Sequence, residues 1–420
     1  MSRFRSVGIL AAGTAVAQLV ALGVAPLLGR LYSPSDFGLF GVFVSVAAIA
    51  GVVVTMRLDL AVVVPDSDEE AMDVVGVGVL ITAVMSTAAA LLVLAAGGLL
   101  GELLGEPGVV PLLALLPLYL GATGVHQMLN YWSTRTSHFG RLSVAEMTRS
   151  VSVAGAQLTG GYLRAGPAGL TLGQVLGQVV AAAILVARAA SVTTGMFTRR
   201  LSLRTARNVL GRFRQFVVFG TPQVLVNALN QGLPAFVLTV TFDAGIAGHY
   251  LMAQRLLSAP IGLLGRSTRQ VLYPRLSLAM RDGSALRVAL RATSLLAVVA
   301  AVPVALVVAA GPAIYRFVLG SEWELAGEFS RYLVLWLAVA FVNIPSVSLV
   351  PLLEMQRWHA VYEVVYLCAR LAALLLGGST GDPLTGIALF SLVGVGFNLV
   401  LIAAPLIRLR RTIGRQSRSV

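Results

Sequence analysis

Two arginines, Arg255 and Arg370, lie deep inside segments that are otherwise apolar enough to cross a membrane. A charge at the centre of a bilayer costs about 2.5–3.5 kcal/mol even on the lenient insertion scale. Such a residue therefore indicates either a structural ion pair or a water-filled cavity. We favour the cavity for both, and this reading predicts a site for an anionic substrate.

Other polar residues extend this candidate site. Arg30 ends the first apolar segment and Arg57 the second, each either as an interfacial anchor or at the mouth of a cavity. Residues 216–241 contain two prolines around a group of amides, which is typical of a bending helix that lines a cavity; hydrogen bonding between helices is the alternative. The prolines are Pro222 and Pro234, and the amides are Asn227, Asn230 and Gln231.

The acidic residues suggest a smaller role. Glu363 and Glu354 are candidates to carry a coupling proton, so a proton or sodium gradient is a candidate driving force. Glu146 and Arg149 are three residues apart and predict a local helix pair. We expect no cofactor and no metal site, because the chain has 1 cysteine and 4 histidines, which are scattered.

The elements that hold these residues are predicted to be transmembrane helices. The chain has 420 residues, of which 57% are hydrophobic and 12% charged, which excludes a water-soluble globular protein. An all-α fold of about twelve spans is expected, because each needs about 20 apolar residues and no alternating strand pattern occurs. The spans are predicted near 7–29, 37–55, 74–96, 109–130, 143–163, 167–187, 216–241, 244–264, 292–311, 332–353, 359–377 and 384–407.

Charge predicts the orientation of these spans. All 31 basic residues are arginine, and most fall on the side that also holds both termini, whereas Arg30, Arg164, Arg316 and Arg331 fall on the other. This asymmetry predicts a multi-pass protein of a bacterial cytoplasmic membrane with both termini in the cytoplasm. The formal charge of +13 therefore reflects topology, with no nucleic-acid partner expected.

The two halves of the chain share a pattern. Asp36-Phe-Gly-Leu-Phe-Gly41 and Asp243-Ala-Gly-Ile-Ala-Gly248 both read D-x-G-x-x-G, and each follows the first span of its half. An internal repeat predicts two six-helix bundles related by a pseudo-two-fold axis along the membrane normal. The predicted domains are a bundle over 1–190, a basic linker over 191–215, a bundle over 216–407 and a basic tail over 408–420. The linker is either an amphipathic helix on anionic lipid or a solvated connection.

Several strings carry a family resemblance. They are TAVAQ from Thr14, GRLYSPSDFGLF from Gly29, RLDLAVVVP from Arg57, AQRL from Ala253 and YPRL from Tyr273. These strings resemble the Wzx-type oligosaccharide flippases of O-antigen and polysaccharide biosynthesis, in the multidrug/oligosaccharidyl-lipid/polysaccharide exporter superfamily. The resemblance implies alternating-access translocation of an undecaprenyl-diphosphate-linked oligosaccharide. The deep arginines would then bind the diphosphate, and a glycan polymerase and other assembly proteins become candidate partners.

Three alternatives remain open at this point. A lipid II flippase is chemically close, whereas a multidrug exporter of the same superfamily fits the deep arginines less well. A polytopic glycan polymerase or ligase is the alternative from another class. The string Gly377-Gly-Ser-Thr-Gly381 matches a nucleophile pattern, but it lies between two helices rather than after a strand, so we predict a transporter and not an enzyme.

Overall fold

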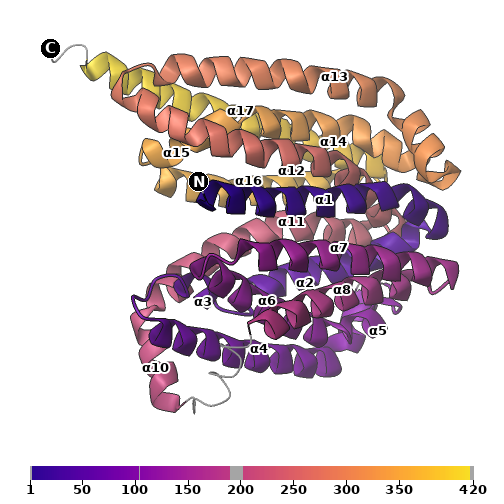
Figure 1. Cartoon of the computed structure of the whole chain (residues 1–420). Coiled ribbons are helices and arrows are strands. Elements are labelled where there is room, and N and C mark those ends of the chain that lie inside the picture. The colour runs from indigo at the N-terminus through magenta and orange to yellow at the C-terminus, as the bar shows by residue number, and fades with distance from the viewer. Residues whose placement is uncertain (1, 104, 190–201, 417–420) are drawn as a thin grey trace. The chain divides into compact units, whose positions relative to one another are not determined.

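The computed structural model describes residues 2–103, 105–189 and 202–416, and every regular element in these ranges is a helix (Figure 1). The all-α prediction is therefore confirmed. Parts of the predicted linker (191–201) and tail (417–420) lie outside the described residues.

The chain divides into two compact units, Met1–Gly248 and His249–Val420. The domain boundaries expected from the sequence stay a prediction. The first unit contains α1 (Ser2–Leu31), α2 (Pro34–Val53), α3 (Leu58–Ala61), α4 (Asp68–Leu103), α5 (Val109–Leu113), α6 (Leu116–Arg135), α7 (Phe139–Tyr162), α8 (Gly166–Arg188), α10 (Leu203–Arg212), the π-helix η1 (Phe216–Gly220), α11 (Thr221–Thr241) and the first turn of α12 (Ala244–Arg281).

The second unit contains the rest of α12 and five further α-helices. They are α13 (Ala285–Leu319), α14 (Glu324–Val342), α15 (Ile344–Leu352), α16 (Gln356–Gly378) and α17 (Pro383–Gln416), with the short 3-10 helix η2 (Ser321–Trp323) before α14. Within this unit α13 packs along α14, and α17 packs against both α14 and α16.

Nine helical segments of the described chain are long and apolar enough to cross a membrane. Large apolar side chains on them are exposed, including Leu94 at 83% and Val302 at 73%. Such exposure is costly in water but not in lipid. The other three expected spans coincide with the helices α1, α7 and α12. In α1 the apolar segment Ala15–Leu31 is shorter than these nine, whereas α7 and α12 are more polar.

The D-x-G-x-x-G segments begin α2 and α12. Ser33 and Asp36 form a reciprocal capping box at the start of α2, and the Asp243 carboxylate accepts the backbone N–H of Ile246 at 2.8 Å. Both acids thus satisfy amides that a helix start leaves unpaired. The glycines allow a close crossing, because a methyl group on Gly38 would overlap the carbonyl of Ala244.

Candidate functional site

The helix break after α2 holds a small polar cluster. Met56 and Arg57 have positive φ values of 48° and 62°, which L-residues with side chains rarely adopt. The Asp59 carboxylate lies 3.7 Å from the Arg57 guanidinium and accepts the Thr55 hydroxyl at 3.0 Å. On α6, Gln127 accepts from the same hydroxyl at 3.3 Å, so the break is tied to a neighbouring helix.

Arg57 itself, a predicted site residue, is only partly satisfied. Its side chain is 22% exposed, whereas that of Asp59 is 4% exposed. Its buried Nε atom has no hydrogen-bond partner among the residues that the structure describes. The sequence placed Arg57 at the end of a span but did not identify Thr55 and Gln127, which neither charge nor spacing marks out.

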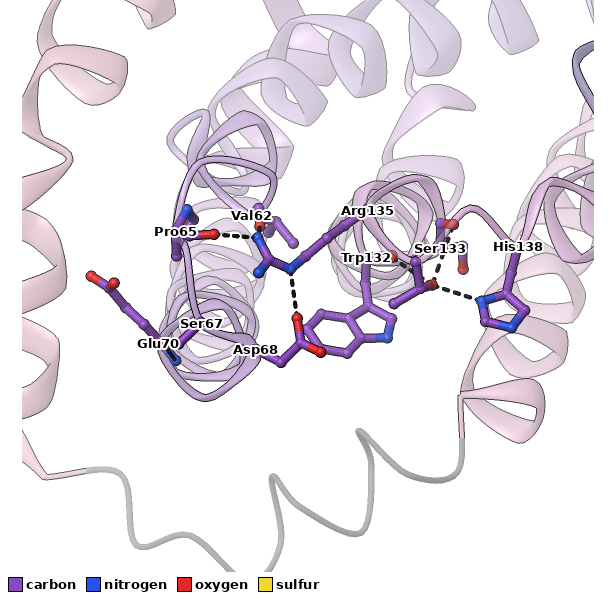
Figure 2. A network of polar contacts seen from close by, with 10 residues as sticks. Val62, Pro65, Ser67, Asp68, Glu70, Trp132, Ser133, Arg135 and His138 are labelled. Atoms are coloured by element: carbon purple, nitrogen blue, oxygen red, sulfur yellow. Dashed lines mark hydrogen bonds and ion pairs between the residues drawn. The ribbon is translucent and has the colours of Figure 1, made fainter. Parts of the chain in front are cut away.

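Arg135, near the end of α6, holds the loop that leads from α3 into α4 (Figure 2). Its guanidinium donates to the Pro65 carbonyl at 2.6 Å and to the Asp68 carboxylate at 3.0 Å. A longer bond of 3.4 Å reaches the Val62 carbonyl. One cation thus fixes the connection between the broken helix and the long helix α4.

A second charged cluster joins α6 to α7. The Glu146 carboxylate accepts from Arg149 at 3.0 and 3.1 Å, which confirms the pair predicted from their spacing. Its other oxygen lies 3.6 Å from Nε2 of His126, a buried residue of α6. Neither charge nor spacing connects His126 with this pair in the sequence, because the contact depends on how the two helices pack.

Arg370 is enclosed by aromatic rings in the second unit. The residue is 4% exposed, and its guanidinium carbon lies 3.9 Å from the ring centre of Trp336 and 3.8 Å from that of Phe390. A third ring, Tyr366, lies at 5.0 Å. The Nε and Nη2 atoms have no hydrogen-bond partner in the described part of the chain.

This enclosure satisfies the faces of the guanidinium but not its N–H groups. Cation–π contacts contribute about 2 kcal/mol when desolvated, whereas burying an ion costs several kcal/mol. Beside Arg370, the buried Tyr250 hydroxyl also lacks a hydrogen-bond partner among the described residues, and its ring contacts Phe390 at 6.0 Å. The N–H groups of Arg370 and the Tyr250 hydroxyl are thus donors without an acceptor, and they are buried from solvent in this conformation.

Arg255 has a different setting on α12. It is half-buried, and it makes no hydrogen bond or ion pair with any residue that the structure describes. Its neighbours Met252 and Ala253 are fully buried, so the helix is packed on one side while the guanidinium remains unpaired. Of the two deep arginines, Arg255 is the more accessible.

The predicted amides of α11 lie within the first unit. Gln231 donates to Asn227 at 2.6 Å, and both side chains are exposed. Both side-chain polar atoms of Asn230 are buried without a hydrogen-bond partner in the described residues. Pro234 is buried inside the helix, and the side chain of Pro222 lies outside what the structure describes. The π-helix η1 immediately precedes α11.

The remaining predicted residues are spread along the chain. Arg30 is exposed at the end of α1, and Glu354 is exposed with a φ of 53° in the turn before α16. Glu363 lies on α16, where its carboxylate is 3.5 Å from Nε2 of His359. No cluster that resembles a metal site occurs among the described residues.

An open cavity of 580 Å³ lies between α13 and α14. Its charged residues pair with one another: Arg316 lies 3.6 Å from Glu324, and Arg331 lies 2.8 Å from Glu328. Because each cation has its own carboxylate, this cavity offers less to an anion than the unpaired arginines do.

Comparison with known proteins identifies the family. The sequence profile of a family described as "Polysaccharide biosynthesis protein" matches residues 27–328, well over half of the chain. The chain belongs to this polysaccharide biosynthesis family. The recognition of a Wzx-like chain from its motifs is thereby confirmed. No curated protein sequence matches the chain.

Solved structures share the fold. The lipid II flippase MurJ in an inward closed conformation aligns with a TM-score of 0.72 and 14% identity, covering 94% of this chain and 87% of MurJ. A multidrug resistance MATE family transporter of the MOP superfamily, in an inward-facing conformation, aligns with a TM-score of 0.65 and 14% identity over 97% and 96% of the two chains. A MOP superfamily transporter from Pyrococcus furiosus, whose binding pocket is described as having reverse polarity, aligns at 0.62 and 13% identity over 98% and 96%.

Proposed function

We propose that this polysaccharide biosynthesis protein is a flippase, which moves an undecaprenyl-diphosphate-linked oligosaccharide across the bacterial cytoplasmic membrane by alternating access. Family membership over residues 27–328 supports a role in polysaccharide assembly. The fold, shared with MurJ and MATE transporters, supports translocation rather than glycan transfer. We propose no cofactor for this activity.

The observation that carries the proposal is the unpaired guanidinium of Arg255. An arginine in a membrane helix needs an anion or water, because its uncompensated charge costs about 2.5–3.5 kcal/mol at mid-bilayer. No carboxylate among the described residues pairs with it. A diphosphate supplies oxygens that fit the two N–H edges of a guanidinium, so Arg255 is the first candidate to bind it.

The other predicted residues take supporting roles in this proposal. Arg370, with Arg30 and Arg57, provides further positive charge for the diphosphate. The exposed Asn227 and Gln231 offer donors and acceptors to sugar hydroxyls. The lipid tail stays in the bilayer, and the His359–Glu363 pair is the candidate site for a coupling proton.

A lipid II flippase is the second candidate, favoured by the TM-score of 0.72 with MurJ. Both substrates carry a diphosphate on a polyprenyl tail, so Arg255 would act alike in either case. Proteoliposomes that contain one labelled substrate at a time separate the two. Translocation of lipid II in preference to an oligosaccharide substrate would overturn our assignment, and glycan transfer without translocation would overturn transport itself.

The role of Arg255 is testable in cells that lack their own flippase. We expect Arg255→Ala to reduce surface glycan by about tenfold or more, since a buried charge-assisted hydrogen bond is lost. Arg255→Lys should retain part of the activity, because lysine keeps the charge but not the paired donors. Immunoblots of membranes check protein level, and Arg281→Ala, at an exposed position on the same helix, serves as the control. Normal surface glycan in Arg255→Ala cells would remove this residue from the site.

A further inference from the structure

The helix α10 and the residues that follow it carry a stripe of exposed arginines. Arg204 and Arg207 lie three residues apart on α10 and share one side at helical spacing, and Arg214 lies two residues past the end of the helix. Gly211 lies between them along this stripe, and nothing lies within 4 Å of the position that its Cβ would take. The stripe is therefore basic and exposed, and no side chain projects from its centre at Gly211.

The opposite side of α10 packs against other helices of the first unit. Val209 and Phe213 are 6% and 3% exposed and belong to the core that α4 and α6 also form. Arg212, on the flank, pairs with Glu70 of α4. Because protein already covers its apolar side, α10 cannot lie with that side in lipid, and the arginine stripe faces outwards.

The position of α10 puts this stripe at a membrane surface. The helix packs against α4, whose membrane-spanning segment begins at Asp68, and Figure 1 shows it at that end of the first unit. Residues 213–220, which include η1, separate it from the apolar helix α11. Leu203, at the first turn, is 91% exposed and extends the outward face with an apolar group.

We propose that the arginine stripe binds the phosphate groups of anionic phospholipids in the adjacent leaflet. None of its three guanidinium groups has a hydrogen bond or ion pair with a residue that the structure describes. The nearby acid Glu70 is already paired with Arg212. Three unpaired arginines, two on α10 and one just past its end, match a group of lipid phosphates, and the exposed Leu203 contacts the acyl region below them.

Native mass spectrometry of the full chain in detergent tests the proposal. Phosphatidylglycerol and phosphatidylcholine of equal chain length are added together, and the lipids bound per protein are counted. Each arginine near an anionic surface strengthens binding by about fivefold. We expect the triple substitution R204Q/R207Q/R214Q to weaken phosphatidylglycerol binding by about tenfold or more at low salt, with phosphatidylcholine binding unchanged.

Three controls make the outcome decisive. R204K/R207K/R214K keeps the charge and should keep most of the binding. The matched triple R275Q/R281Q/R291Q removes the same charge from other exposed positions and should leave it unchanged. Inorganic phosphate at millimolar concentration should not displace the lipid. Unchanged lipid binding in the stripe variant, an equal loss in the matched triple, or displacement by free phosphate would each overturn the proposal.

Discussion

Four arginines of this chain lie in different settings, and each setting gives the residue a different role. Arg135 holds a loop and pairs with Asp68, whereas Arg57 lies at a helix break and pairs with Asp59. Arg370 is enclosed by rings, and Arg255 is unpaired among the described residues. The sequence identified the two deep arginines from their apolar surroundings. It could not identify the rings around Arg370, because Trp336 and Phe390 come from other helices.

The enclosure of Arg370 leads to a prediction about stability and transport. Methionine has a similar length and no charge, so Arg370→Met removes a desolvation cost of several kcal/mol together with cation–π contacts of about 2 kcal/mol. We expect the thermal unfolding midpoint in detergent to stay the same or rise, while surface glycan is lost. Unchanged glycan in Arg370→Met cells would show that the charge is not needed for function.

A lower midpoint would also be informative. It would mean that the rings stabilise the cation by more than its burial costs, which contradicts the balance given above. Cys368→Ala, an exposed position on the same helix, is the control for substitution in α16.

At the scale of elements, the repeated D-x-G-x-x-G pattern proved to combine two functions. Its acids cap helix starts, and its glycines let backbones touch. The sequence predicted a repeat but could not show that the two copies meet. Gly38 faces the carbonyl of Ala244, and Gly248 faces that of Pro34, so α2 and α12 cross with backbone against backbone inside the first unit.

This crossing predicts a strong effect of adding one methyl group. In Gly38→Ala, the new Cβ would overlap the Ala244 carbonyl, and overpacking of this kind costs about 1–3 kcal/mol. We expect a lower thermal unfolding midpoint and reduced surface glycan. Gly155→Ala on α7 meets nothing within 4 Å and should raise helix stability by about 0.5–1 kcal/mol. A Gly38→Ala protein as stable as Gly155→Ala would contradict the close crossing.

At the scale of the whole molecule, hydropathy predicted the helical class and located every long helix. Hydropathy predicted the continuity and the polarity of individual spans less well. The expected span 332–353 is divided at Asn343 between α14 and α15, and the spans at α7 and α12 are too polar to be recognised as membrane spans by composition. α7 carries Glu146 and Arg149, and α12 carries Arg255. Polar groups that pack inside a bundle lower the hydropathy of a helix without preventing it from crossing the membrane.

The orientation of the chain follows from whether α1, α7 and α12 cross the membrane. If α1, α7 and α12 all span the membrane, arginine-rich connections fall on one side, and reporter fusions after Leu100 and after Gly378 both lie outside the cell. We expect a periplasmic alkaline phosphatase to be active at both positions, and a fusion after Asp282, between α12 and α13, to be active only with a cytoplasmic reporter. Each span between Leu100 and Asp282 moves the chain to the other side of the membrane. With all five expected spans the two positions lie on opposite sides, and without α12 they would lie on the same side. A cytoplasmic signal after Leu100 or Gly378 would therefore contradict the predicted topology, and an Asp282 fusion on the same side as Leu100 would show that one of the five spans between them does not cross.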